Sequence, residues 1–90
     1  MKRPEPRRCV LDARHDSRDT VFDALARDLG FPAHWGRNLD ALYDVLRADI
    51  AGPIEIVWRA GAGGRDLDAI RAVLRDVARE RADVVLKENS

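Results

Sequence analysis

Apolar residues recur along the chain with two periods, and together they predict six secondary-structure elements. Short apolar runs predict three strands, at residues 9–13, 54–58 and 83–87. Apolar residues spaced three and four apart predict three helices, at residues 19–29, from residue 38 towards the Gly52–Pro53 pair, and at residues 66–81. The predicted order of elements is therefore β-α-α-β-α-β.

Capping and helix-breaking residues mark the ends of the predicted helices. Asp19 can cap the first helix at its N-terminus, and Gly30 with Pro32 after it ends that helix. Asn38 is a capping residue for the second helix. The Gly52–Pro53 pair closes that region, and we expect a trans bond there because only about 5% of X-Pro bonds are cis.

Helices between successive strands favour a parallel sheet, because parallel strands need a long crossover connection. We therefore predict an α/β fold, a small three-stranded parallel sheet with three helices packed on it. Ninety residues suit one domain. We place this domain at residues 9–90 and interpret residues 1–8 as a basic N-terminal tail.

Charge is balanced overall but unevenly distributed. Sixteen basic and sixteen acidic residues leave a net charge of zero. This balance argues against direct binding to nucleic acid, which depends on excess positive charge. Residues 1–8 carry a charge of +3, whereas residues 16–49 contain seven Asp, no Glu and four Arg and carry −3. The acidic segment indicates a basic partner.

Few residues offer the chemistry of an enzyme or a cofactor site. Cys9, the single cysteine, lies in an apolar run and is expected to be a buried thiol. His15 and His34 are far apart and lack the further ligands of a metal site. The glycine-rich segment 60–64 lacks the third Gly of a dinucleotide-binding loop. We expect no enzyme activity, no metal and no cofactor.

The sequence shows neither the pattern of a membrane span nor that of a secretory signal. No apolar run approaches the roughly 18 residues of a membrane span. The charged N-terminus lacks the apolar stretch of a secretory signal. We therefore expect a cytoplasmic protein that does not bind a membrane.

Three arginines lie along one side of the predicted third helix: Arg71, Arg75 and Arg79. The same helix carries acidic residues, and Asp68–Arg71 and Asp76–Arg79 are spaced for ion pairs across one helical turn. Because these charges cancel over the helix, we favour a solvated surface. Binding of RNA through this row and the basic tail is an alternative.

The segment 31–47 combines features typical of a recognition surface. One face of its predicted helix is apolar, formed by Leu39, Leu42, Val45 and Leu46. The opposite face carries Asp40, Tyr43, Asp44 and Arg47. Aromatic and arginine side chains are enriched at protein interfaces. Two interpretations stand, a recognition surface or a solvated helix preceded by a core Trp35.

This segment resembles the barstar family, intracellular protein inhibitors of secreted ribonucleases. The matching residues are Phe31-Pro32-x-His34-Trp35-Gly36-x-Asn38-Leu39-Asp40-Ala41-Leu42-Tyr43-Asp44. The surrounding elements agree, so that the resemblance extends over roughly residues 9–87. It implies an inhibitor without catalysis of its own, which occludes the active site of a ribonuclease with its second helix and the preceding loop.

The resemblance also implies roles for single residues. Asp44 matches the central carboxylate, which takes the place of an RNA phosphate, and Asp40 matches a second carboxylate of that face. Asp76 matches an acidic residue at the rim. The implied partner-binding residues are His34, Trp35, Gly36, Asn38, Leu39, Asp40, Tyr43, Asp44, Arg47 and Asp76. The implied partner is a secreted or toxin ribonuclease of the barnase type, for which this would be the bacterial immunity protein.

Several positions depart from the family pattern. Arg37 and Arg47 add positive charge beside the acidic face, and Asp49 stands where an aromatic residue is expected. The connection between Trp58 and Ile70 is shorter, which predicts the loss of one short helix. We interpret these departures as adaptation to a different ribonuclease. A regulatory interaction module that binds another basic protein on the same scaffold is the alternative.

Overall fold

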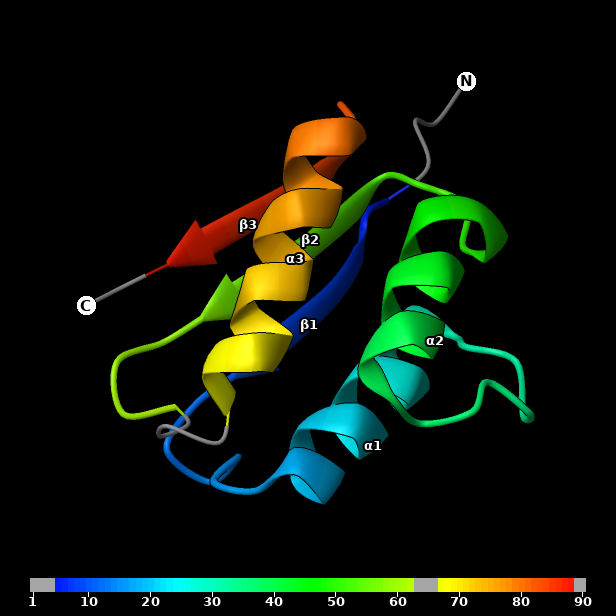
Figure 1. The fold of residues 1–90 in the computed structure, drawn as a ribbon. Coiled ribbons are helices and arrows are strands. Elements are labelled where there is room, and N and C mark those ends of the chain that lie inside the picture. Colours follow the sequence, from blue (N-terminus) through cyan, green and yellow to red (C-terminus); the bar gives the residue numbers. More distant parts are fainter. Residues whose placement is uncertain (1–4, 63–66, 89–90) are drawn as a thin grey trace.

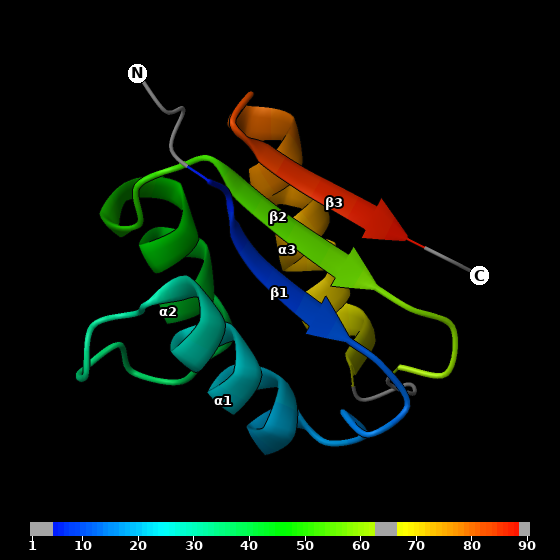
Figure 2. The ribbon, with the colours of Figure 1, turned by 180° about the vertical axis from the view of Figure 1, so that it is seen from behind.

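The computed structural model describes residues 5–62 and 67–88 and contains one parallel sheet with helices on one side (Figure 1). The sheet has the order β1-β2-β3, formed by β1 (Arg7–Leu11), β2 (Ile54–Trp58) and β3 (Val84–Glu88). The helices are α1 (Arg18–Leu29), α2 (Leu39–Asp44), the π-helical η1 (Val45–Asp49) that continues α2, and α3 (Asp68–Glu80). Figure 2 shows the sheet in front of α3, with α1 and α2 on the β1 side. The predicted α/β fold class is confirmed.

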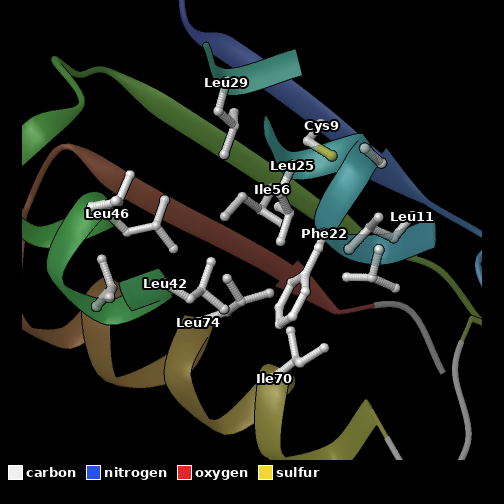
Figure 3. Close-up of a cluster of buried hydrophobic side chains, with 14 of the residues drawn as sticks. Cys9, Leu11, Phe22, Leu25, Leu29, Leu42, Leu46, Ile56, Ile70 and Leu74 are labelled. Carbon is white, nitrogen blue, oxygen red and sulfur yellow. The ribbon is translucent and has the colours of Figure 1, made fainter. Parts of the chain in front are cut away.

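Alternation along the strands sends every second side chain into one core. Ile56 of β2 is completely buried and is the register partner of Cys9 in β1. Figure 3 shows these two side chains meeting Leu25 of α1 and the apolar faces of α2 and α3. Burial raises the pKa of the Cys9 thiol to about 12, so this cysteine stays protonated and packs as a small apolar residue. The predicted burial of Cys9 is confirmed.

The cap of helix α1 is Ser17, two residues earlier than the predicted cap Asp19. The Ser17 hydroxyl accepts a hydrogen bond from Thr20 N at 3.2 Å, and the Thr20 hydroxyl accepts one from Ser17 N at 3.2 Å. This reciprocal pair satisfies two free N–H groups, which makes Ser17 the cap in place of Asp19. Gly30, with φ of 74°, ends the helix as predicted.

The outer strands differ from the predicted bounds by one or two residues. β1 begins at Arg7, because Arg7 N donates to Pro53 O at 2.9 Å and the Arg7 guanidinium to Leu29 O at 3.0 Å. The Gly52–Pro53 bond is cis, which corrects the expected trans isomer. In folded proteins tertiary contacts normally select one isomer of an X-Pro bond, and a general frequency of cis bonds does not take such contacts into account.

Some expectations lie outside the described residues. Residues 1–4 of the predicted basic tail belong to this group, as do the end of the glycine-rich segment and the start of the predicted third helix at residues 63–66. The expected loss of a short helix before α3 falls partly on the same residues.

The arginines of the α3 row form ion pairs with carboxylates of the same protein. Arg71 Nε lies 2.5 Å from Glu88 Oε1, and Arg75 Nη2 lies 2.8 Å from the same oxygen. The predicted Asp76–Arg79 pair forms at 3.8 Å. Arg71 turns to β3, away from Asp68. These contacts favour the interpretation of the row as a solvated surface.

Glu88 makes folding sensitive to acid. Hydrogen bonds from Arg75 and Arg71 hold the pKa of Glu88 below its ordinary value of 4.5, so the unfolded chain binds a proton there more readily. The stabilisation is fully present above that ordinary value and is lost as the pH falls through the lower folded pKa. Urea denaturation between about pH 5 and pH 3 should show a shallower pH dependence of unfolding free energy in Glu88→Gln than in the unchanged protein. Identical slopes would contradict this role of Glu88.

Candidate functional site

The loop before α2 is folded tightly onto the first turn of that helix. Asn38 Oδ1 accepts a hydrogen bond from Ala41 N at 2.8 Å, which confirms Asn38 as the cap. Gly36 and Arg37 both have positive φ, 84° and 51°. A Cβ on Gly36 would lie 3.1 Å from the Ala41 Cβ. Glycine is therefore suited to this position both by its backbone angles and by the close approach of the helix.

Trp35 anchors this loop in the core. Its side chain is only 6% exposed. Its ring packs edge-to-face on Phe22, with centroids 5.0 Å apart, and on Phe31, with centroids 5.1 Å apart. This burial matches the interpretation of Trp35 as a core residue and leaves little of its ring for a partner to touch.

Asp40 and Asp44 lie one turn apart on the exposed side of α2. On the other side of the same helical stretch, Leu42, Val45 and Leu46 are at most 4% exposed. Leu42 and Leu46 face Leu74 of α3 in Figure 3, which fixes the orientation of the helix. Within residues 5–62 and 67–88, no ion pair shorter than 4.0 Å reaches either aspartate. Both carboxylates are therefore exposed to solvent without a cationic partner among the described residues.

Tyr43 and Arg47 connect this helical stretch to α3. The Tyr43 hydroxyl donates a hydrogen bond to the Glu80 carboxylate. This bond holds the pKa of Tyr43 above its ordinary value, because ionised tyrosine would lose it and face a second negative charge. The Arg47 guanidinium lies 5.9 Å from the centroid of the Tyr43 ring, and Arg47 Nε lies 3.9 Å from Glu80 Oε2.

Glu80 is the member of this surface that the sequence pattern did not identify. It lies one turn beyond Asp76 on α3, a spacing that places two carboxylates on one side of a helix. The four-residue spacing of Asp76 and Glu80 was the only signal in the sequence that could have pointed to Glu80. The role of Glu80 depends on its contact with Tyr43, which is 37 positions away in the chain.

The two arginines expected beside the acidic face behave differently. Arg37 turns towards α1, with its Nη1 2.7 Å from Asp23 Oδ1 and its Nη2 3.4 Å from Asp19 Oδ1. Its charge is therefore paired with two carboxylates of α1. The Arg47 side chain is 61% exposed and its charge remains on the same helical stretch as Asp44.

The other predicted contact residues surround this helix. His34 is exposed in the loop, Leu39 is half-buried at the start of α2, and Asp76 is exposed on α3. Within residues 5–62 and 67–88, the surface encloses no pocket and no group of three metal-ligating side chains. No helix in this part of the chain is both apolar and long enough to cross a membrane.

The fold and the surface define a small α/β domain that displays carboxylates from two packed helices. The family model described as Barstar (barnase inhibitor) matches residues 7–87, and the chain belongs to the barstar family. It is 35% identical over 54 residues to a protein of Bacillus subtilis (strain 168) named "Putative ribonuclease inhibitor YrdF". This match covers 59% of the chain and 59% of that relative, which is about three-fifths of each. The resemblance inferred from segment 31–44 is confirmed.

Proposed function

We propose that this protein inhibits a ribonuclease by binding over its active site. The observation that carries the proposal is the exposed pair Asp40 and Asp44, which lies on a capped helix and is paired with no cation of the described residues. A ribonuclease active site is cationic because it holds phosphodiesters. A carboxylate on a rigid helix can replace a phosphate there through charge-assisted hydrogen bonds to arginine.

The chain's family membership and the name of its relative support this proposal. In the proposed complex Asp44 takes the place of a phosphate, Asp40 assists it, and Asp76 binds at the rim. The packing contacts come from the loop and the rest of the helical face: His34, Gly36, Asn38, Leu39, Tyr43 and Arg47. Trp35 supports the loop from inside. The partner is a secreted or toxin ribonuclease of the barnase type, met in the cytoplasm of the bacterium that makes it.

Electrostatics would also set the speed of binding. Carboxylates of α2 and α3 that face a cationic cleft accelerate encounter, and this acceleration is screened by salt. Fast association matters for an inhibitor that must capture a nuclease before it cuts the RNA of the cell.

The test is a titration of the purified protein into a barnase-type ribonuclease, followed by RNA cleavage and calorimetry. We expect stoichiometric loss of cleavage, a submicromolar Kd, and an association rate that falls as salt increases. A ribonuclease encoded beside this gene is the second enzyme to try. Failure to bind either enzyme would contradict the proposal. Tight binding of a basic protein without loss of cleavage would favour a regulatory module.

A further inference from the structure

Arg81, directly after α3, reaches across to the C-terminal end of η1. Its Nη1 donates to Leu46 O at 2.7 Å and to Ile50 O at 2.8 Å. The last carbonyls of a helix have no partners within the helix, and the negative end of the helix dipole favours a cation. Arg81 thus acts as a C-terminal cap supplied from 31 and 35 positions away.

The acidic helix needs such an external anchor. α2 has six residues, which is too few for a helix to be stable by itself. It continues into η1, where Ile50 N donates to Val45 O at 3.2 Å, five residues back. This wider turn is rare and less favourable than an α-helical turn. Asn38 holds the start of the helix, and Arg81 holds its end.

The Arg81 guanidinium is itself held in place. Its Nε and Nη2 donate to the two carboxylate oxygens of Asp83, at 2.9 and 2.6 Å. Gly52 leaves room for this pair, because a Cβ there would lie 2.0 Å from Asp83 Oδ2 and 3.1 Å from Arg81 Nη2. The side chain of Arg81 is only 17% exposed. The end of η1, the turn before β2 and the start of β3 therefore meet at one guanidinium.

We propose that Arg81 is a positioning residue for the acidic face: it fixes the end of η1 and so sets the direction in which Asp44 points. The proposal rests on the proposed inhibition of a ribonuclease. A group that mimics a phosphate must be presented within about 0.5 Å of its ideal place. The planar guanidinium can bind two carbonyls and a carboxylate together, whereas the lysine ammonium has three donors and no fixed fork.

Arg81→Lys tests the proposal, because it keeps the charge and removes the geometry. We expect faster amide hydrogen exchange in residues 42–50 of the free protein and about tenfold weaker binding to a barnase-type ribonuclease. Arg27→Lys is the matched control, since Arg27 is 71% exposed and pairs with its neighbour Asp28. It should change neither quantity. Unchanged exchange in Arg81→Lys would overturn the anchoring role.

A double-mutant cycle separates positioning from general destabilisation. If Arg81 acts through Asp44, Arg81→Lys should weaken binding less than about twofold in a protein that already carries Asp44→Ala. An equal loss in both backgrounds would overturn the positioning role. If the unchanged protein binds no ribonuclease, the proposed function fails, and the hydrogen exchange of the free protein still decides whether Arg81 anchors η1.

Discussion

Asp44→Ala is expected to weaken binding to a barnase-type ribonuclease by at least about 30-fold, equivalent to about 2 kcal/mol. The physical reason is the loss of one charge-assisted contact together with the burial of enzyme cations that then lack a partner. Calorimetry or surface plasmon resonance measures the effect directly. Most of the change should appear in the dissociation rate.

Asp68→Ala is the matched control, because Asp68, in the first turn of α3, is likewise an exposed aspartate on a helix. It removes the same charge and should change the Kd less than about twofold, as expected for a charge remote from the interface. Similar losses for Asp44→Ala and Asp68→Ala would exclude Asp44 as the phosphate mimic. Asp40→Ala should fall between the two.

Trp35→Ala is expected to lower the free energy of unfolding by about 3–5 kcal/mol. The substitution removes a large buried side chain and two edge-to-face aromatic contacts. A domain of this size has a total stability on the order of 5–13 kcal/mol, so the loss is a large share of it. Urea denaturation followed by circular dichroism measures this change.

Trp35→Phe separates the core role of Trp35 from a contact role. A phenyl ring keeps much of the packing against Phe22 and Phe31, so the variant should remain folded at room temperature. If Trp35 acts only by supporting the loop, folded Trp35→Phe should bind the ribonuclease nearly as well as the unchanged protein. A stable Trp35→Phe that has lost binding would show that the indole itself contacts the enzyme.

Elements with a clear apolar period were predictable from local spacing. Of the residues of α3 that the period placed inside, Ile70, Leu74 and Val77 are completely buried, whereas Val73 is half-buried. Asn38 caps α2 as its residue type predicts. The short strands were located within one or two residues, because a strand's ends depend on its partners and β1 is extended by contacts with Pro53.

Two errors concerned the N-terminal cap of α1 and the isomer of the Gly52–Pro53 bond. Ser17 and Asp19 are both good capping residues, and the reciprocal bond with Thr20 decided between them. The Gly52–Pro53 bond is cis, and the base rate that favoured trans carries no information about tertiary contacts.

The sequence by itself determined the order of elements, the buried face of each helix and the presence of two aspartates on the exposed face of α2. These properties follow from the 3.6-residue period of a helix and the two-residue period of a strand, which act over neighbouring residues. The tertiary structure alone decided that Glu80 meets Tyr43, that Arg37 turns away to α1, and that Arg81 caps η1. Such contacts join residues 14 to 37 positions apart, and they exist only because the packed core brings separate elements together.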